Sequence, residues 1–310
     1  MTRLRTVRRG PKFLPVLKPG EKWSMIGGRE GSALKRGASR RIQSLKDTAR
    51  RKPAVTAVYF VLRVLVILTM VRQFFNGDYE NVFLCALTLV LFLLPAIIEH
   101  RLRIDFPDTM EIIILLFIFS AEILGEIRSY YTTFPGWDAV MHTLNGFLCA
   151  AVGFSLVDML DRNERFSLSL SPVFLAIVAF CFSMTIGVLW EFFECAMDTF
   201  LLKDMQKDAI LNTISTVALD PTGGNTPVII RDIQDVILVS GGQQIPLGLG
   251  GYLDVGLRDT MKDLGVNFIG AAVFSFIGYF YLIGRSKGRF ARRFIPQVLE
   301  DEAPDPAQEI

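Results

Sequence analysis

Six long apolar stretches divide the chain and limit what it can fold into. They run over residues 54–74, 81–99, 109–127, 138–160, 173–200 and 265–284. At about 1.5 Å of rise per residue, each is long enough, or nearly so, to cross a hydrocarbon core of about 30 Å as a helix. A backbone inside a bilayer must satisfy its own hydrogen bonds, and a helix does so. The predicted fold class is therefore an all-α integral membrane bundle with about six transmembrane helices.

The charged residues are segregated along the chain, and their distribution predicts its orientation. Residues 1–53 form a basic N-terminal arm, since the first 52 residues hold 16 of the 33 lysines and arginines but only three acids. Cytoplasmic segments carry an excess of these bases, so the arm is expected inside. Transmembrane helices 1–5 are expected within residues 54–200 and helix 6 within 259–285. Six crossings return residues 286–310, the predicted cytoplasmic tail, to the same side, which gives an N-in, C-in protein.

Residues 201–258 are too long for a tight turn and too polar to span a membrane. Turn signals surround two runs, 228–233 and 235–239, that are rich in Val, Ile and Leu. We expect a small external β-hairpin there. The stretch from Asp204 to Asn212 also repeats the pattern D-x-x-K-D-x-x-x-N found from Asp259 to Asn267. Two interpretations stay open: two helix N-termini that line one site, or structural N-caps whose acids complement helix dipoles.

Polar and ionisable residues gather near one end of the predicted bundle. With the N-in orientation, the outer ends of the third, fourth, fifth and sixth helices carry Glu122, Glu126, Asp138, His142, Glu191, Glu194, Asp263 and Asn267. Helical spacing places Asp138 and His142 on one face, and the same holds for Asp259 and Asp263. Charged groups at membrane depth are costly and usually functional. We therefore expect a shared site in the outer leaflet, although Asp138 or Asp259 taken alone could simply mark a helix end among headgroups.

The residue types suggest a role for each position in this site. An imidazole together with several carboxylates can hold a divalent cation, which is the cofactor hypothesis. The candidate metal ligands are His142, Asp138, Glu126, Glu191, Asp259 and Asp263. The candidate catalytic residues are His142, Glu191, Glu194 and Asp263. The candidate substrate-binding residues are Lys262, Lys207, Asn267, Trp137 and Trp190.

Over roughly residues 55–285 the chain resembles the uncharacterised YjdF-type inner-membrane proteins and, more distantly, the VanZ-like proteins. The likeness rests on Leu124-Gly-Glu126, on Trp137-Asp138 with His142 and Gly146, on Glu191-x-x-Glu194, and on Asp259-Thr-x-Lys-Asp263 followed by Gly270. The resemblance implies a multi-helix protein of a prokaryotic plasma (inner) membrane. It implies no settled reaction, although VanZ-like members are associated with glycopeptide-antibiotic resistance.

Three functions of different classes fit these features. The first is a metal-dependent membrane enzyme that acts on a lipid or lipid-linked substrate, with His142 as ligand or base and a glutamate as acid or base. The second is a non-enzymatic envelope or binding protein whose polar residues form a structural knot between helices. The third is an ion-coupled transporter, in which membrane acids relay protons. Membrane lipids are the expected partners, together with a lipid-like substrate, and nucleic acid is not expected.

Overall fold

The computed structural model describes residues 51–161, 170–284 and 291–298. The basic arm predicted over residues 1–53 lies almost entirely outside the described residues. The same is true of most of the cytoplasmic tail predicted over residues 286–310. The predictions made for those two segments therefore stay predictions.

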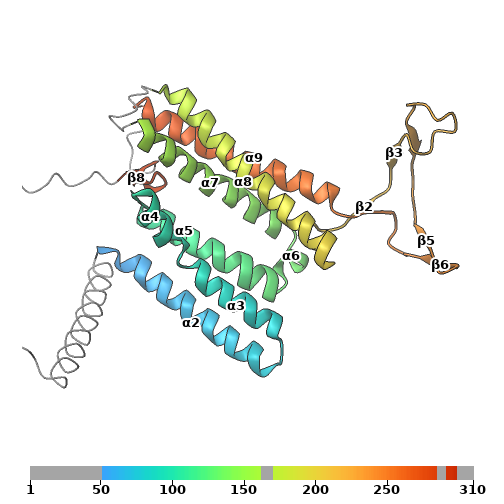
Figure 1. Ribbon diagram of the computed structural model, residues 1–310, viewed down its shortest axis with the longest axis horizontal. Coiled ribbons are helices and arrows are strands. Elements are labelled where there is room, and N and C mark those ends of the chain that lie inside the picture. The colour runs from blue at the N-terminus through green and yellow to red at the C-terminus, as the bar shows by residue number, and fades with distance from the viewer. Residues whose placement is uncertain (1–50, 162–169, 285–290, 299–310) are drawn as a thin grey trace, which may run out of the picture. The chain divides into compact units, whose positions relative to one another are not determined.

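Helices make up most of the described chain (Figure 1). The α-helices are α2 (Pro53–Phe75), α3 (Tyr79–Leu91), α4 (Leu94–Leu102), α5 (Asp108–Phe119), α6 (Tyr130–Thr133), α7 (Trp137–Asp161), α8 (Pro172–Leu201) and α9 (Leu257–Leu282). Among the described residues, five helical segments are long and apolar enough to cross a membrane: α2, α3 with α4, α7, α8 and α9. The predicted helical membrane bundle is thus confirmed in its class, with five candidate spans rather than six.

The third predicted span is the one that this set omits. Its residues are helical, but the helix changes from α5 to a π-helix, η1 (Ser120–Ile127), at Ser120. A π-helix bonds residue i to i+5, so it widens the turn and shifts every following side chain around the axis. The shift affects Glu122 and Glu126, which were expected to point at the shared site. Together α5 and η1 still cover residues 108–127.

Local chemistry explains where the longest helix begins and ends. Ser171 caps α8, because its hydroxyl accepts the backbone N–H of Phe174 at 3.2 Å, and Pro172 occupies the first turn. At the other end, Leu202 adopts a left-handed conformation with φ of 51° and stops the helix. The carboxylate of Asp198 then accepts the backbone N–H groups of Met205 and Gln206 at 2.7 and 2.9 Å. The chain leaves α8 in a fixed direction as a result.

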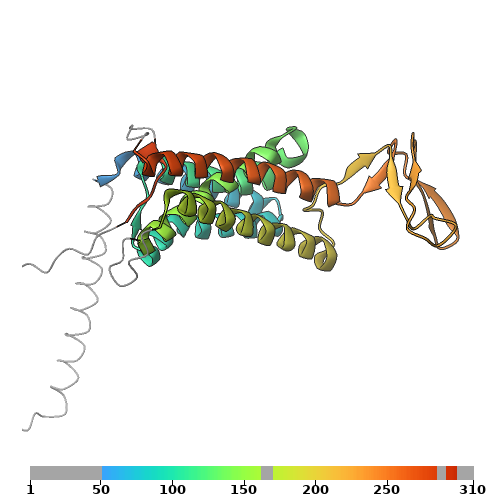
Figure 2. The same ribbon diagram turned by 90° about the horizontal axis from the view of Figure 1, so that it is seen from above.

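Helices α7, α8 and α9 pack against one another along their length (Figure 2). Close approach of α7 and α9 depends on two glycines. A Cβ atom at Gly146 of α7 would overlap the backbone carbonyl of Asn267 on α9, and one at Gly270 would overlap the carbonyl of Thr143 on α7. Small residues at such crossings let two helix backbones touch. The two glycines therefore set the spacing of α7 and α9 directly below the predicted site.

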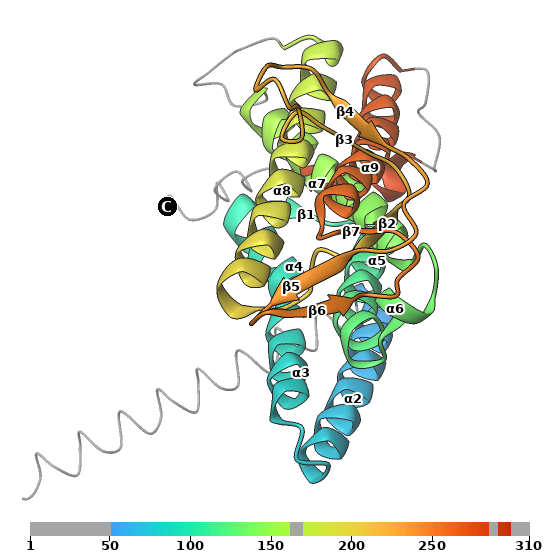
Figure 3. The same cartoon turned by 90° about the vertical axis from the view of Figure 1, so that its right-hand side faces the viewer.

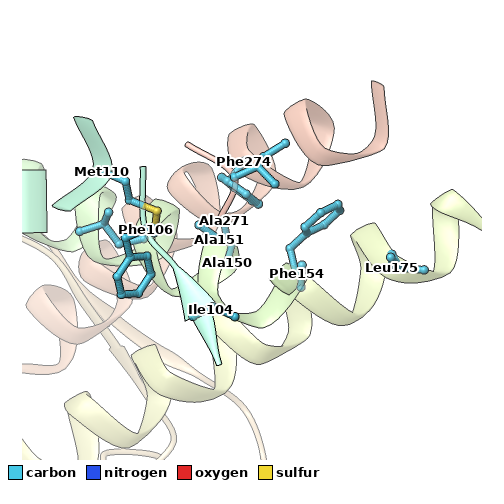
Figure 4. Close-up of a cluster of buried hydrophobic side chains, with 12 residues drawn as sticks. Ile104, Phe106, Met110, Ala150, Ala151, Phe154, Leu175, Ala271 and Phe274 are labelled. Atoms are coloured by element: carbon cyan, nitrogen blue, oxygen red, sulfur yellow. The ribbon is translucent and has the colours of Figure 1, made fainter. Parts of the chain in front are cut away.

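One end of this three-helix bundle holds the apolar core (Figure 4). Its buried residues are Ile104, Phe106, Met110, Leu148, Ala150, Ala151, Phe154, Leu175, Ala179, Ala271, Phe274 and Ile295. Two short strands, β1 (Ile104–Asp105) and β8 (Gln297–Val298), pair antiparallel beside it, and η2 (Ala291–Arg293) precedes β8. The segment after α9 thus contributes to the core of the bundle, which the sequence did not predict.

The insertion between α8 and α9 emerges at the opposite end of the bundle (Figures 1 and 3). Its strands are β2 (Ala209–Leu211), β3 (Ile214–Thr216), β4 (Val228–Ile230), β5 (Ile237–Ser240), β6 (Gln243–Pro246) and β7 (Tyr252–Asp254). They form the antiparallel pairs β2–β7, β3–β4 and β5–β6. The pair β2–β7 joins the two ends of the insertion close to the start of α9.

Two expectations about the insertion are corrected. The runs 228–233 and 235–239 do form strands, but they do not pair with each other: β4 pairs with β3, and β5 pairs with β6. The hairpin turn lies at Gly241 and Gly242, whose positive φ values of 60° and 79° suit a tight two-residue turn. Asp204 does not begin a helix, because Asp198 holds the next residues in a non-helical path into β2. The repeated pattern therefore has two different conformations.

Candidate functional site

Buried polar residues from three helices meet at the end of the bundle that faces the insertion. α7 contributes Asp138 and His142, α8 contributes Glu191, and α9 contributes Asp263. We call these four residues the polar cluster. His142, Glu191 and Asp263 are 8%, 4% and 1% exposed, and they lie within segments long and apolar enough to span a membrane. The predicted convergence of the fourth, fifth and sixth apolar stretches is therefore present in the structure.

His142 lies at the centre of the polar cluster. Its Nε2 is 3.4 Å from Asp138 Oδ1 and 3.9 Å from Asp263 Oδ2, while its Nδ1 is 3.7 Å from Glu191 Oε1. Asp138 precedes His142 by one helical turn, so their proximity follows from α7 alone. The contacts to Glu191 and Asp263 depend on the packing of α8 and α9. One imidazole thus contacts carboxylates from all three helices.

Three of these side chains could offer ligand atoms to one metal ion. Asp138, His142 and Asp263 each offer a ligand atom, and these atoms all lie within 4.8 Å of one another. Ligands bound to one ion at about 2.0–2.2 Å can be no more than roughly 4.4 Å apart, so a small contraction would suffice. An imidazole and two carboxylates suit Zn²⁺ or Mn²⁺. The donor set fits a divalent cation.

Glu191 supplies a second observation that points to a ligand. Both of its carboxylate oxygens are buried, and neither has a hydrogen-bond partner among the described residues. Asp263 Oδ1 is in the same condition. A buried polar atom left without a partner costs about 1–3 kcal/mol, and a charged one costs more. Glu191 Oε1 and Asp263 Oδ1 instead make longer ion-pair contacts, to His142 and Lys262, at 3.7 and 3.5 Å.

Lys262 lies at the exposed rim of the polar cluster. Its Nζ is 2.7 Å from Asp259 Oδ1, 3.0 Å from Asp138 Oδ2 and 3.5 Å from Asp263 Oδ1. The side chain is 49% exposed, whereas Asp138 and Asp263 are far more buried. Lys262, expected to bind substrate, therefore contacts three of the carboxylates expected to bind metal.

Both carboxylate oxygens of Asp259 have hydrogen-bond partners in the surrounding structure. Its Oδ1 accepts the ammonium of Lys262, and its Oδ2 accepts the backbone N–H of Lys207 at 2.8 Å. Gln206 Nε2 donates to Thr260 Oγ1 at 2.5 Å, which adds a second tie to α9. Residues 203–208 thus form a strap fastened to the end of α8 and to the start of α9. The sequence places Asp259 among the metal ligands, but its oxygens already have these partners.

A layer of amides supports the polar cluster from inside the bundle. Asn267 lies one turn below Asp263, is 1% exposed, and accepts a hydrogen bond from Asn145 Nδ2 at 3.2 Å through its Oδ1. Its Nδ2 is 3.6 Å from Met184 Sδ, so the side chain contacts α7 and α8. Ser183 Oγ donates to the carbonyl of Gly146 at 2.7 Å in the same layer. Asn267, expected to bind substrate, is enclosed by protein atoms instead.

The remaining predicted site residues lie around the cluster rather than in it. Glu194 is 7% exposed and accepts the indole N–H of Trp190 at 2.7 Å. Trp190 itself is 43% exposed, while Trp137 has a buried indole nitrogen without a hydrogen-bond partner among the described residues. Lys207 pairs with Asp204. Glu126 is exposed at the end of η1 and is not one of the three residues that could hold a metal ion.

Tyr131 was missed by the sequence reasoning. It lies on α6, and its ring covers Gly125 of η1 so closely that a Cβ there would overlap it. Burial raises the pKa of the Tyr131 hydroxyl above its ordinary value, and the carboxylates of Glu126 and Asp138 raise that pKa further. Nothing in the sequence predicts that a tyrosine in this short connector packs against η1. The role of Asp198 in fastening the strap follows from the backbone path of residues 203–208 and has no local sequence signal.

Comparison with known families decides the affiliation of the chain. A family model described as predicted membrane protein (DUF2238) matches residues 56–284. The chain belongs to this family. The match takes in the whole three-helix bundle, the polar cluster and the insertion, and it confirms the resemblance to YjdF-type proteins, which are members of DUF2238. The comparisons contain nothing on the VanZ-like proteins. Neither the curated proteins nor the solved structures gave a match.

Proposed function

We propose that this DUF2238 member is a metal-dependent membrane enzyme that acts on a lipid or lipid-linked substrate. The observation that carries the proposal is the polar cluster. Three potential ligand atoms lie within 4.8 Å of one another, and Glu191 beside them has two buried oxygens without partners. Packing alone gives no reason to bury such groups, because each unsatisfied atom lowers stability. Binding a cation would satisfy them.

The proposed roles follow from the contacts of each side chain. Asp138, His142 and Asp263 would hold a divalent cation, which when bound polarises an oxygen of the substrate or of water. Glu191 approaches His142 from α8 and is placed to accept or donate a proton at the reacting oxygen. Glu194 is held by the indole of Trp190, so its carboxylate has a fixed orientation one turn further along α8. Lys262 and Lys207 supply positive charge on the side of the strap, which favours an anionic group such as phosphate.

The surroundings of the polar cluster support a substrate from the bilayer. The cluster lies within candidate spans, and α8 presents large apolar side chains outward beside it. Phe192, Phe193 and Phe200 are 67%, 46% and 80% exposed. Apolar groups of this size are expected to contact lipid chains rather than water. A substrate with an acyl or isoprenoid chain could therefore reach the cluster sideways along α8 while its polar group meets the strap.

The proposed topology has six spans, with α5 and η1 together as the third, in a prokaryotic plasma membrane. The basic N-terminal arm is placed inside, which puts the insertion and the polar cluster on the outer side. Single cysteines at positions 76, 132 and 230, introduced into a cysteine-free variant, test this topology. A membrane-impermeant thiol reagent should label all three in intact cells. Labelling only after the membrane is opened would place the site on the cytoplasmic side.

Metal binding to the purified full chain in detergent tests the central claim. The wild-type protein should bind a single Mn²⁺ or Zn²⁺ ion, measured by titration calorimetry and by elemental analysis after gel filtration. His142→Ala and Asp263→Asn should lose this ion and keep the folded yield. If neither metal binds to well-folded wild-type protein, the enzyme proposal loses its basis.

A structural polar knot is the second candidate, and Lys262 favours it. In the described structure its ammonium already joins Asp138, Asp259 and Asp263, and the amides of Asn145 and Asn267 continue the network inward. A knot of this kind would hold α7 and α9 in register without any ion. It predicts that Asp263→Asn lowers the thermal stability of the protein, whereas a metal site predicts loss of the ion from a stable fold.

A further inference from the structure

Lys262 occupies a position where a cation is expected. Its ammonium lies 3.0 Å from Asp138 Oδ2 and 3.5 Å from Asp263 Oδ1. Asp138 and Asp263 are also two of the three residues that could hold a metal ion together with His142. The same pair of carboxylates thus contacts the ammonium of Lys262 and belongs to the proposed metal site. A monovalent ammonium and a divalent ion that close together would repel each other strongly in a poorly solvated site.

The two sides of this contact differ in their freedom to move. Asp138 and Asp263 have side chains that are 17% and 1% exposed, and they project from helices α7 and α9, which Gly146 and Gly270 hold in contact. Lys262 is 49% exposed and ends in a flexible four-carbon chain. Its third partner, Asp259, lies on the side of the strap. The ammonium can therefore withdraw toward Asp259 and water while the carboxylates stay in place.

We propose that Lys262 and a divalent cation exchange at this site. In the metal-free protein the ammonium bridges Asp138 and Asp263 and offsets their mutual repulsion. When the metal binds, the ammonium moves to the exposed rim, where it faces the substrate side with a free positive charge. This inference rests on the proposed metal site and deepens it, because it makes Lys262 both the competitor of the metal and a determinant of specificity for an anionic substrate group.

The first test compares Mn²⁺ affinity among variants of the full chain in detergent at one pH. Lys262→Gln removes the competitor, so it should bind Mn²⁺ about tenfold more tightly than wild type. Lys262→Arg keeps a cation at the rim and should bind like wild type or more weakly. Lys203→Gln is the control, because Lys203 pairs with Glu80 of α3 and its loss removes an equal charge at the same end. Its Mn²⁺ affinity should stay close to that of wild type.

The second test uses the wild-type chain and needs no variant to fold. An amine-reactive reagent is added with and without Mn²⁺, and labelling of each lysine is measured by peptide mass spectrometry. Lys262 should react several-fold faster when Mn²⁺ is present, since its ammonium no longer bridges carboxylates. Lys203 is 44% exposed and pairs with Glu80, which is not a candidate metal ligand, so it serves as the internal standard.

The outcomes separate this inference from the proposed function. Equal or weaker Mn²⁺ binding by Lys262→Gln, or a reactivity of Lys262 that Mn²⁺ leaves unchanged or lowers, overturns the exchange and leaves the metal site intact. A similar gain in Lys203→Gln also overturns it, because bulk charge would then explain the effect. Absence of Mn²⁺ binding in both wild type and Lys262→Gln removes the metal site itself.

Discussion

The two ends of the α7–α8–α9 bundle are built from the same helices but bury opposite kinds of side chain, apolar at one end and polar at the other. At the apolar core, Phe154 of α7 and Phe274 of α9 pack edge to face, with ring centroids 6.0 Å apart, and β1 and β8 lie beside them. At the polar cluster, the same two helices bring His142 and Asp263 within 3.9 Å. The first end gains stability from every contact. The second end combines ion pairs with buried carboxylate oxygens that have no hydrogen-bond partner among the described residues.

This difference indicates which residues should affect the stability of the fold and which should affect the proposed ligand binding. Asn267 and the glycines around it lie between the two ends, so the helix spacing set there is shared by both. Residues on the core side can be judged by the free energy of unfolding. Residues on the cluster side should also be judged by ligand binding, because both carboxylate oxygens of Glu191 are buried without a hydrogen-bond partner among the described residues. Variants at each end should therefore change different measured quantities.

Truncation in the apolar core should have the largest effect on stability. Phe274 is fully buried and contacts Phe147 and Phe154, so Phe274→Ala should lower the free energy of unfolding by about 3–5 kcal/mol. Thermal melting and reversible denaturant unfolding in detergent measure this. Phe276→Ala is the matched control, because Phe276 is on the same helix and 65% exposed, and it should change stability little. Equal losses in both variants would mean that the core does not hold the bundle together.

Removal of a carboxylate in the polar cluster should leave stability intact and abolish metal binding. Asp263→Asn keeps the shape of the side chain but replaces a ligand that is 1% exposed, so Mn²⁺ affinity should fall roughly 100-fold or more. Calorimetry measures the affinity, and thermal melting measures the fold.

Glu126→Gln is the control for that variant. Glu126 was expected among the ligands, but it is exposed on η1 and is not one of the three residues of the candidate metal group. Its replacement should leave Mn²⁺ affinity unchanged. A fall in affinity equal to that of Asp263→Asn would bring the third span back into the site and would blur the contrast between the two ends.

Two glycines of α9 allow the effect of helix propensity on stability to be distinguished from the effect of contact between helices. Gly270→Ala places a methyl group against the carbonyl of Thr143, so α9 must move from α7, at a cost of about 1–3 kcal/mol. Mn²⁺ affinity should fall as well, because the same movement separates Asp263 from His142. Gly265→Ala meets no atom within 4 Å and should raise stability by about 0.5–1 kcal/mol through helix propensity. If both substitutions changed the melting temperature in the same direction, the proposed contact between a side chain at position 270 and the carbonyl of Thr143 would be wrong.

Much of this arrangement could be predicted from the sequence, for reasons that particular residues show. Apolar length located α2, α7, α8 and α9 to within a few residues at most ends, since membrane helices must be long and internally bonded. Apolar length alone put the start of α9 at residue 265, because its first turns are charged, whereas the predicted bounds of helix 6 begin at residue 259, close to the observed start at Leu257. Spacing placed Asp138 and His142 on one face, and charged groups at membrane depth are rare enough to single out Glu191 and Asp263.

The rest depended on interactions that leave no local signal. The change to π geometry at Ser120 turned Glu122 and Glu126 relative to the α-helical expectation. The non-helical path of residues 204–208 depends on two backbone hydrogen bonds to Asp198, which lies on the preceding helix. The predicted strand pairing in the insertion was wrong because a short apolar run does not determine which strand it pairs with. The contacts of Ile104 and Ile295 with the core join segments almost two hundred residues apart.

The smallest expected effect concerns a carboxylate whose oxygens have hydrogen-bond partners. This carboxylate differs in that respect from the carboxylate oxygens of the polar cluster that lack such partners among the described residues. Asp220 lies in the exposed insertion, and its carboxylate accepts the backbone N–H of Thr222 at 2.9 Å, the hydroxyl of Thr222 at 2.7 Å and the backbone N–H of Thr226 at 3.2 Å. These bonds, led by the Thr222 backbone N–H, lower the pKa of Asp220 below its ordinary value. A lowered pKa in the folded state means that the turn is stabilised by the ionised form.

The stabilisation of this turn should therefore be complete above the ordinary aspartate pKa of about 3.9 and should disappear as the pH falls through the lowered pKa of the folded protein. NMR titration of the Thr222 and Thr226 amides should show both resonances moving together in that acidic range, while amides of β5 and β6 stay in place. Asp220→Asn should remove this titration and leave Mn²⁺ affinity unaltered. Movement of the two amides near neutral pH instead would show that Asp220 is not held by them.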